Sequence, residues 1–263
     1  MDGFVIKLKS AREIAKMRDA GRVVAEALAQ VKLLAVPGAT TAQLDQAVAR
    51  VFQKYDAIPL FKGYPNSTQG RSAFPAVICA SVNDAVVHGI PNNRPLVEGD
   101  IVSVDTGCKV DGWCGDSAIT VAIGRVAPEI QHLLDVTAQT LELAISAMSR
   151  CKNWYDVAAL MERFVRSQNL FVIEKFVGHG IGQTMHEEPQ VPNFVSKALK
   201  KKNIQLEPGL VLAIEPMVAL GTKNVETLSD HWTVVTKDRR ASAHFEHTVA
   251  VTPDGPRVLT LFD

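Results

Sequence analysis

The sequence has few cysteines and no long apolar run. Its 263 residues include four cysteines, and no two of them form a Cys-x-x-Cys pair. Because no signal peptide is recognised either, we expect free thiols in a reducing cytosol rather than a disulfide framework. Cys108 and Cys114 could be read as zinc ligands, but they lack a second pair, and buried thiols are the simpler interpretation. No stretch of about 18 apolar residues is present, so we expect no membrane-spanning helix.

The chain also lacks an excess of charge of either sign. Its 28 Lys and Arg residues balance 28 Asp and Glu residues. A net charge of zero gives no bulk attraction to nucleic acid or to a membrane, so we expect neither specific DNA nor a membrane as a partner. A hydrophobic content of 47% and a charged content of 21% are ordinary for a globular protein. We therefore expect a cytoplasmic monomer with a sizeable core.

Two pairs of helices are predicted, one in each half of the chain. Ser10 and Glu13 form a capping box before an amphipathic stretch, and Thr41 and Asn153 are expected to cap later helices. The four helices are expected from 11 to just before Pro37, at 41–53, at 127–149 and at 153–166. Similar spacings separate the two first helices and the two second helices. The chain is therefore predicted to be one domain, 1–263, with two internally related halves at about 1–123 and 124–263.

The strand pattern favours an antiparallel α+β fold. Asp111-Gly112 is a strong two-residue hairpin signal, which would place Asp105 opposite Ala118 and diagonal to Asp116, with both aspartates on one face. Strands are expected at 76–81, 100–108, 113–123, 171–177, 210–216, 231–237 and 243–252. The alternation of helices and strands is also typical of a doubly wound sheet. Hairpins and paired helices favour the antiparallel arrangement.

Five ligand-type side chains lie within apolar or glycine-bounded stretches. They are Asp105, Asp116, His179, Glu215 and Glu246. An unpaired buried carboxylate costs several kcal/mol or stays protonated, and four carboxylates with one imidazole cannot satisfy one another. Oxygen- and nitrogen-rich sites suit divalent Mn, Fe, Co or Zn. Four carboxylates carry enough charge for two ions, so a two-metal hydrolase is the leading hypothesis.

Most other polar residues have plainer explanations. Asp111 is interpreted as a turn residue, and Glu187 and Glu188 as residues that solvate or cap a loop. Taken singly, four histidines are interpreted as satisfied or solvated side chains: His132, His231, His244 and His247. His88 and His186 differ, because each lies in a conspicuous motif close to the expected ligands.

Five sequence blocks surround these residues. They are Ser81–Pro91 with His88, Val104-Asp105-Thr106 with Gly115-Asp116, Gly178–Pro189 with His179 and His186, Ile214–Met217 with Glu215, and Phe245–Thr248 with Glu246. Together they resemble the type I methionine aminopeptidases, in a bacterial style without a zinc-binding extension. The resemblance covers nearly the whole chain.

The resemblance implies a fold, an activity and a set of metal ligands. The fold is the pseudo-twofold "pita-bread" arrangement, an antiparallel sheet flanked by two helix pairs. The activity is removal of the initiator methionine from nascent chains with a small second residue. Asp105 would hold the first metal and His179 and Glu215 the second, while Asp116 and Glu246 would bridge the two. The ions would be Co, Mn, Fe, Zn or Ni.

The resemblance also implies roles around the metals. Glu215 would act as a proton shuttle, His88 would contact the substrate near the scissile amide, and His186 would polarise its carbonyl. Asn83 and Ser242 would bind a monovalent cation. The methionine pocket would be lined by Phe61, Tyr64, Cys79, Met185 and Trp232.

The chain departs from the family pattern at several positions. Residues 66 to about 75 are interpreted as an insertion between Tyr64 and the strand that holds Cys79. Phe61 replaces a frequent tyrosine, Met185 a frequent phenylalanine, and His244 a frequent glutamine. The first three departures bear on the shape of the pocket.

Two alternatives and one further partner stay open. The same fold also serves Xaa-Pro aminopeptidases, and it occurs in catalytically dead binding proteins, which lose metal ligands. Ribosomal RNA near a nascent chain is a further candidate partner for a lysine cluster, although a solvated loop is the simpler interpretation. The lysines are Lys197, Lys200, Lys201 and Lys202.

Overall fold

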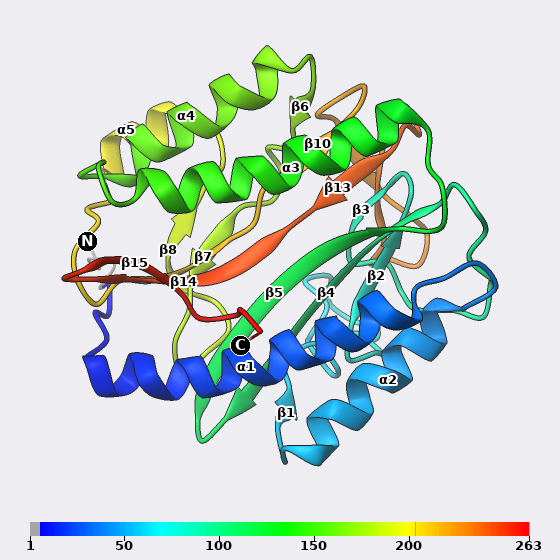
Figure 1. Cartoon of the computed structure of the whole chain (residues 1–263), viewed down its shortest axis with the longest axis horizontal. Coiled ribbons are helices and arrows are strands. Elements are labelled where there is room, and N and C mark those ends of the chain that lie inside the picture. Colours follow the sequence, from blue (N-terminus) through cyan, green and yellow to red (C-terminus); the bar gives the residue numbers. More distant parts are fainter. Residues whose placement is uncertain (1–5, 203, 263) are drawn as a thin grey trace.

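Helices and strands alternate along the chain in this computed structural model, which describes residues 6–202 and 204–262. The helices are α1 (Ala11–Leu34), α2 (Thr41–Lys54), α3 (Pro128–Ala147), α4 (Trp154–Ser167) and α5 (Lys197–Lys202). The strands are β1 (Ile58–Pro59), β2 (Cys79–Val82), β3 (Ala85–Val87), β4 (Ile101–Val110), β5 (Trp113–Ala122), β6 (Phe171–Val172), β7 (Gly178–Gly180), β8 (Glu187–Val191), β9 (Val211–Ile214), β10 (Met217–Ala219), β11 (Val225–Thr227), β12 (Val234–Thr236), β13 (Ser242–His244), β14 (Glu246–Thr252) and β15 (Gly255–Val258). Figure 1 shows α1 and α3 lying across one face of the central sheet, with α2 and α4 beside them.

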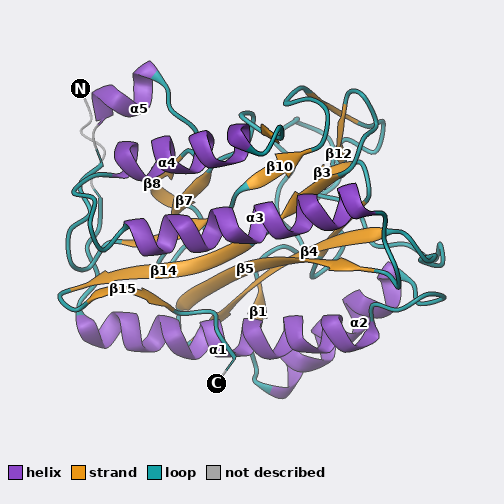
Figure 2. Ribbon diagram, turned by 45° about the horizontal axis from the view of Figure 1, so that its top comes forward, coloured by secondary structure: helices purple, strands orange, loops and turns teal. Residues whose placement is uncertain are grey.

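The central sheet has nine strands and is antiparallel. Its main path runs β1-β4-β5-β14-β9-β7-β8, with β2 added to β4 and β15 added to β14. Two three-stranded sheets, β13-β10-β6 and β11-β12-β3, lie beside it, and Figure 2 shows the strands as a layer behind the helices. The antiparallel α+β prediction is confirmed, and the doubly wound alternative is wrong. The internal duplication into two halves stays a prediction.

The β4–β5 hairpin has the turn and register that the sequence predicts. Asp111 and Gly112 have φ values of 47° and 82°, the left-handed conformation that a two-residue hairpin turn requires. Asp105 pairs with Ala118 across the two strands. Because side chains two residues apart on a strand share a face, Asp116 projects on the same side as Asp105.

The helix starts follow the predicted caps with one exception. Ser10 forms the expected capping box with Glu13, and Asn153 accepts a hydrogen bond from the Asp156 amide. The cap of α2 is Thr40 rather than Thr41, so that prediction was wrong by one residue. The Thr40 side chain accepts from the Gln43 amide, whereas the Thr41 hydroxyl donates to the Asn92 carbonyl. Both threonines suit a cap, and the long-range contact decides between them.

Each helix pair buries an apolar face against a different part of the sheet. The cluster under α1 and α2 includes Val104 and Ile119, and the cluster under α3 and α4 includes Leu212 and Val249. The first contact is unusually close, because a Cβ on Gly115 would lie 2.8 Å from the backbone nitrogen of Gly21 in α1. Only glycine permits this approach. It presses α1 against β5 directly beside Asp116.

Several expected strands are shorter or broken. The expected strands at 210–216 and 243–252 break at Glu215-Pro216 and at Phe245, where each chain segment passes from the central sheet to a three-stranded sheet. Pro216 has no N–H with which to continue a ladder. The expected strand at 171–177 keeps only its first two residues. Glu215 at the first break, and His244 and Glu246 on either side of Phe245, line the site described below.

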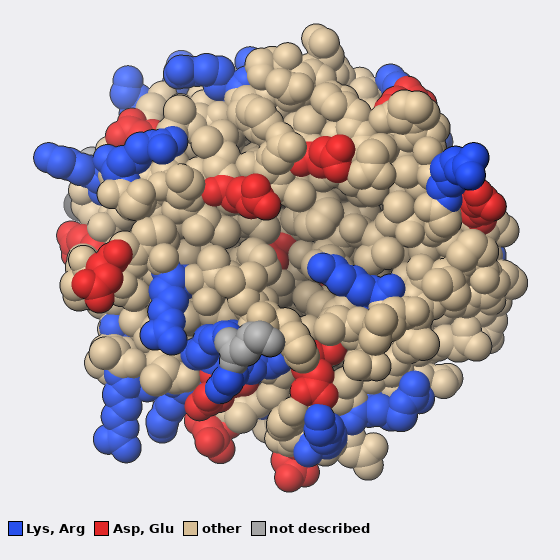
Figure 3. Space-filling view, in the orientation of Figure 1, with Lys and Arg blue, Asp and Glu red and all other residues tan. Residues whose placement is uncertain are grey.

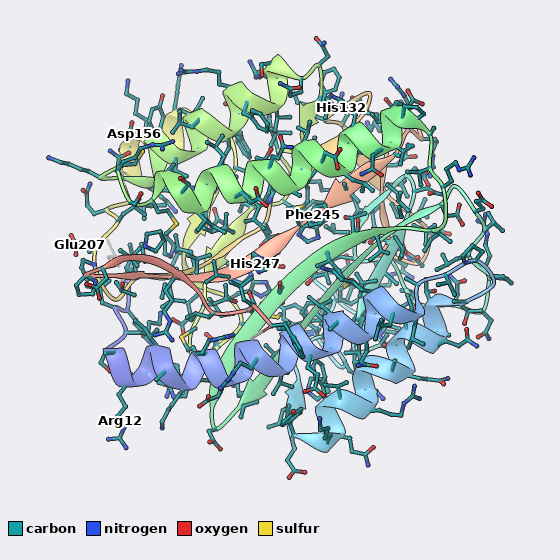
Figure 4. The ribbon with its side chains drawn as sticks, in the orientation of Figure 1. Arg12, His132, Asp156, Glu207, Phe245 and His247 are labelled. Atoms are coloured by element: carbon teal, nitrogen blue, oxygen red, sulfur yellow. The ribbon has the colours of Figure 1, made fainter. Side chains whose placement is uncertain are left out.

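The face that carries the helices has a mixed surface. Figure 3 shows acidic and basic side chains interspersed over this face, a few of them close to its centre. Phe245 and His247 lie between the two helix pairs in Figure 4, so Glu246 between them points to the opposite face of the sheet. In residues 6–202 and 204–262, no helix combines the length and apolar character needed to cross a bilayer. The lysine cluster, expected as a loop, forms the short helix α5 instead.

Candidate active site

A cavity of about 290 Å³ opens on the face of the sheet opposite α1 and α3. It collects every residue that the sequence assigned to divalent-metal binding, catalysis or the substrate pocket. These residues are Phe61, Tyr64, Cys79, His88, Asp105, Asp116, His179, Met185, His186, Glu215, Trp232 and Glu246. They come from positions up to 185 residues apart in the sequence, from Phe61 to Glu246. The fold therefore brings into one cavity the residues that the sequence motifs had suggested as a common site.

Strand register explains why the carboxylates converge. Ala118 on β5 pairs with Asp105 on β4 and also with Glu246 on β14. Paired residues project to the same face, so these two acids flank Ala118, and Asp116 joins them two residues away. Thr248 fixes the β5–β14 junction, because its hydroxyl donates to the Asp116 carbonyl at 2.8 Å. Three carboxylates thus meet on one sheet face without any loop having to position them.

His179 completes the floor of the cavity. It lies on β7, next to β9, and its Nε2 is 4.0 Å from Asp116 Oδ2 and 3.6 Å from Glu215 Oε1. Ligand-type atoms of Asp116, His179 and Glu246 all lie within 4.8 Å of one another. Such a cluster of buried nitrogen and oxygen donors has the composition of a transition-metal site.

The His179 ring is held in the tautomer that a metal ligand needs. Its Nδ1 lies 3.0 Å from the Gly180 carbonyl oxygen. A carbonyl only accepts, so Nδ1 carries the proton and the lone pair of Nε2 faces the carboxylates. Burial, and then the nearby His186, lowers the pKa of His179 to about 4. The ring is therefore neutral near pH 7.

The carboxylates lack protein partners that could stabilise their charge. Asp105 Oδ1, Asp116 Oδ1 and Glu246 Oε1 are buried and accept no hydrogen bond within the described residues. Burial raises the pKa of Asp116 to about 7. Burial, and then the charge of neighbouring carboxylates, raises the pKa of Asp105, Glu215 and Glu246 well above the ordinary range. The strands keep space for these oxygens, since a Cβ on Gly107 would lie 2.9 Å from Asp116 Oδ1. A divalent cation fits this donor set, because it would satisfy the orphaned oxygens and their repulsion together.

Two further histidines overlook the acidic floor. His88 follows β3 with a φ of 60°, a conformation uncommon for a non-glycine residue and typical of functional sites. Burial, then the nearby His186 and Lys175, lowers its pKa to about 4. His186 lies 4.3 Å from His179 between ring centroids, and its Nδ1 shares a 2.9 Å hydrogen bond with the Tyr64 hydroxyl. Burial also lowers the pKa of His186. Both rings are neutral near pH 7 and can donate one N–H each.

An apolar wall lines part of the cavity and reaches the carboxylates at Cys79, which pairs with Asp105 across β2 and β4. Phe61, Cys79 and Met185 pack there in one buried cluster, and Trp232 packs against it. Burial raises the pKa of the Cys79 thiol well above its usual range, and the charge of Asp105 raises it further. Cys79 is therefore a neutral, apolar wall group at physiological pH and not a nucleophile.

The sequence interpretation missed several lining residues and misread one. The missed ones are Phe74, Val87, Phe176 and Val177. Phe176 and Val177 directly precede the Gly-His-Gly motif, a signal that could have found them, whereas Phe74 lay within the interpreted insertion. His244 was grouped with ordinary satisfied histidines, and this was wrong. It lines the cavity, is 2% exposed, and its buried Nε2 has no hydrogen-bond partner in the described chain.

The remaining polar predictions fall outside the cavity. The Asn83 side chain bonds with Asp100 and the Ile101 amide, and the Ser242 hydroxyl donates to the Ala85 carbonyl. Ser242 and Asn83 are neighbours, since the Ser242 amide donates to the Asn83 carbonyl at 3.0 Å. Monovalent-cation binding there stays a prediction.

Three other assignments can be compared with the structure. Cys108 and Cys114 are buried free thiols, as the simpler interpretation expected. Glu187 accepts hydrogen bonds from two loop amides, as a capping residue does, but its main partner is the buried Lys9 ammonium. Of the two roles predicted for Glu187, the structure therefore confirms capping of a loop, and it adds the ion pair with Lys9.

Comparison with known proteins places this geometry in a family. Residues 15–253 match the model of metallopeptidase family M24. The chain belongs to this family. It is 41% identical over 256 residues to methionine aminopeptidase 1 of Bacillus subtilis, covering 97% of this chain and 99% of that protein. It is 43% identical over 258 residues to the methionine aminopeptidase of Clostridium acetobutylicum, covering 98% and 99%.

A solved structure agrees with these sequence relationships. The crystal structure of a methionine aminopeptidase from Thermotoga maritima superposes with a TM-score of 0.91 at 39% identity, covering 98% of this chain and all of that one. The expected pita-bread fold is thereby confirmed. The family is one of metallopeptidases, which agrees with the fit of divalent metal to the carboxylate floor.

Proposed function

We propose that this protein is an aminopeptidase that removes N-terminal methionine from peptides and nascent chains whose second residue is small. One observation carries the proposal: a cluster of buried, unsatisfied carboxylates with His179 forms the floor of a cavity that is also lined by apolar and aromatic side chains. The floor can hold metal, and the wall can accept an uncharged side chain. This chain covers each of the two relatives almost completely, and the names of those relatives point to the same activity.

The resemblance to type I methionine aminopeptidases implies how the donor set would be divided between two ions. Asp105 would hold one ion, and His179 and Glu215 the other. Asp116 and Glu246, which meet beside Ala118, would bridge the pair. When bound, two divalent ions would supply an activated water and charge stabilisation for the developing oxyanion. Mn, Fe, Co, Zn and Ni all suit such ligands.

The chain's own residues would move protons and orient the peptide. Burial, and then the charge of Asp116, raises the pKa of Glu215, so its carboxylate, in the deprotonated form, would be basic enough to take a proton from the attacking water and then pass it to the leaving amine. His186, held through Nδ1 by Tyr64, would present Nε2 to the scissile carbonyl oxygen. His88 would contact the amide from the other side of the cavity.

The apolar wall would select the first side chain. Phe61, Tyr64 and Trp232 present aromatic surface, and an unbranched thioether gains from contact with aromatic edges. Phe74 adds a fourth ring, 5.2 Å from Trp232 between centroids and nearly perpendicular to it. The Cys79 thiol and the Met185 side chain complete a wall without charge.

The cellular location and the partners of the enzyme are inferred from its substrate. Nascent chains carry initiator methionine in the cytoplasm, so we place the enzyme there, as a monomer without DNA or membrane partners. Contact between α5 and ribosomal RNA remains a prediction. One lysine of α5 already has a protein partner, since Lys202 Nζ lies 3.9 Å from Glu188 Oε2.

The test is turnover of Met-Ala-Ser after chelation and re-addition of single metals. We expect no activity after chelation, recovery with at least one divalent ion, and little cleavage of Xaa-Pro peptides in the same assays. Preferential cleavage before proline would favour the alternative enzyme of this fold. Binding of peptides without turnover, under any metal, would favour a catalytically dead relative.

A further inference from the structure

A loop that was interpreted only as an insertion contacts the substrate pocket. Residues 66–72 (the 66–72 loop) leave and re-enter the fold at one point. The Gly63 amide donates to the Phe74 carbonyl at 2.8 Å, and the Phe74 amide donates to the Tyr64 carbonyl at 2.9 Å. These two bonds close the base of the loop. The loop therefore begins and ends at two aromatic residues of the cavity, Tyr64 and Phe74.

The 66–72 loop is bonded to a second segment on the rim, the turn at 228–233. Asn66 Nδ2 donates to the His231 carbonyl at 3.1 Å, while Asn66 Oδ1 accepts from the Thr68 amide at 2.8 Å. The Trp232 indole N–H donates to the Ser72 carbonyl at 3.1 Å. Asn66 thus uses one side-chain atom to shape its own loop and the other to hold the neighbouring turn.

The turn that receives these bonds is strained. His231 has a φ of 63°, and left-handed backbone at a non-glycine residue costs free energy that surrounding contacts must offset. Asp230 contributes from within, because its carboxylate accepts from the Trp232 and Thr233 amides. The two hydrogen bonds to the 66–72 loop stabilise the turn from outside. They are made by the His231 carbonyl and the Trp232 indole, and these two residues set the direction of the indole ring.

Trp232 connects the 66–72 loop to the cavity, because its ring contacts two other rings that line the cavity. Its ring stands edge-on to Phe74 at 5.2 Å and to His88 at 6.3 Å between centroids. A change in the orientation of the indole would widen the pocket on the side of Phe74, away from the carboxylate floor. The hydrogen bond that the indole N–H donates to the Ser72 carbonyl fixes this orientation, because indole has a single N–H and only one direction satisfies it.

We propose that the 66–72 loop determines substrate selectivity, with Asn66 and the Ser72 carbonyl acting as positioning groups that hold Trp232 against the first substrate side chain. This inference rests on the proposed function and names the part of the chain that sets its specificity. A fixed indole leaves a slot that fits an unbranched thioether. A loosened indole admits branched chains such as leucine, because apolar pockets discriminate weakly once their walls can move.

The decisive variant is Asn66→Asp. It keeps the oxygen that accepts from Thr68 but removes the N–H that donates to His231. Its matched control is Gln69→Glu, which adds the same charge at the exposed tip of the loop. A third variant, Trp232→Phe, keeps an aromatic ring but removes the indole N–H, and it is combined with Asn66→Asp.

Selectivity is measured as the ratio of kcat/KM for Met-Ala-Ser to that for Leu-Ala-Ser. We expect Asn66→Asp to lower this ratio roughly fivefold, the size of one net hydrogen bond, with kcat for Met-Ala-Ser and metal content unchanged. Gln69→Glu should keep the wild-type ratio. Because both groups act through one ring, Asn66→Asp should lower the ratio no further in the Trp232→Phe background. Equal ratios in Asn66→Asp and Gln69→Glu would overturn the proposal.

A second readout does not depend on turnover. Trp113 and Trp154 are 7% and 0% exposed, so acrylamide quenching of the wild-type fluorescence reports mainly on Trp232. Asn66→Asp should increase quenching and bring the affinity for free L-leucine closer to that for L-methionine, whereas Gln69→Glu should change neither. If wild type fails to cleave Met-Ala-Ser, the proposed function is wrong, and this binding comparison still decides whether the loop controls the pocket. Unchanged quenching and unchanged relative affinity in Asn66→Asp would refute the loop's role.

Discussion

The Tyr64 hydroxyl and His186 Nδ1 lie 2.9 Å apart, at the mouth of the cavity. Their rings meet nearly edge-on at 5.5 Å between centroids, and the His186 ring in turn packs edge-on against His179 at 4.3 Å. The three side chains connect the exposed rim to the carboxylate floor. Because Nδ1 is occupied by Tyr64, the other ring nitrogen is the one left to meet a substrate.

This relationship predicts a catalytic defect without a metal defect. His186→Ala should lower kcat by roughly 10²-fold, since an oxyanion donor acts mainly in the transition state. Tyr64→Phe should cause a smaller loss, about tenfold, because the imidazole remains but is less well oriented. Elemental analysis should find wild-type metal content in both. Loss of metal from His186→Ala would make this histidine a ligand and break the assignment.

The bridging carboxylates should behave differently. Asp116→Ala or Glu246→Ala should abolish turnover and weaken metal binding, because each removes charge from the centre of the donor cluster. Asp100→Asn is the matched control, since Asp100 is another buried carboxylate but bonds to Asn83 and to the Val97 amide. The control should bind metal normally. Full activity of wild type in a verified metal-free preparation would contradict the two-metal mechanism.

Turn and strand patterns in the sequence predicted those parts of the fold that depend on neighbouring residues alone. The Asp111-Gly112 turn fixed the β4–β5 register, and with it the shared face of Asp105 and Asp116. These patterns failed where the chain changes sheets. Pro216 is a local signal for the break after Glu215, but Phe245 lies in an apolar stretch that suits an unbroken strand, and only the pairing of β13 with β10 shows why the strand ends there. Tertiary pairing overrode a strong local pattern.

Some residues of the candidate site could likewise be predicted from the sequence, and others could not. The acidic floor could be anticipated because buried charge in an apolar strand needs an explanation. His244 could not, since its neighbours in sequence do not distinguish a lining histidine from a satisfied one. Phe74 was hidden for another reason. Its position depends on the backbone bonds that close the 66–72 loop, which no residue pattern encodes.

Protons and metal should compete for the carboxylate floor. A carboxyl with a raised folded pKa binds more protons when folded than when unfolded, so the metal-free fold loses stability as pH rises from about 4 toward 7. Bound metal removes this penalty, and its stabilising effect should therefore grow over the same range. His179, with a pKa lowered to about 4, is already neutral there.

Calorimetric titration of Mn²⁺ into chelator-treated protein would measure this competition. In two buffers of different ionisation enthalpy at about pH 6, we expect release of about one proton or more per protein, and weaker affinity than at about pH 7.5. The shift in Tm on adding Mn²⁺ should likewise be larger at the higher pH. Binding without proton release, at equal affinity, would show that the floor carries its full negative charge without metal.

The buried ion pair between Lys9 and Glu187 should contribute to stability rather than to catalysis. Their charged atoms lie 2.8 Å apart, with side chains 5% and 12% exposed. Glu187→Gln should lower the free energy of unfolding by about 3 kcal/mol, because it leaves a buried ammonium unpaired. Replacing both residues, with Lys9→Met added, should recover part of the loss. Denaturant unfolding of the metal-loaded protein measures both effects.

The same pair predicts a pH dependence. Burial tends to raise the pKa of Glu187, but the hydrogen bonds and charge of Lys9 outweigh it, and the pKa is lowered from its ordinary 4.5. A lowered folded pKa means that the stabilisation is complete above about pH 4.5 and is lost as pH falls through the folded value. The stability difference between wild type and Glu187→Gln should therefore shrink on acidification. A constant difference would show that the pair does not titrate as described.

Met185 should make the pocket less selective than an aromatic ring would. It is 9% exposed and packs in the same cluster as Phe61, Phe74 and Cys79. An unbranched thioether has three rotatable bonds and adapts to different neighbours, so it discriminates weakly between methionine and leucine in the substrate. Such differences are worth about 1–3 kcal/mol in an apolar pocket. Met185→Phe should therefore raise the ratio of kcat/KM for Met-Ala-Ser over Leu-Ala-Ser, measured beside Met148→Phe as a control for a buried methionine outside the cavity. If the Met185→Phe ratio stays level or falls, Met185 does not shape the first-residue pocket, although it lines the cavity.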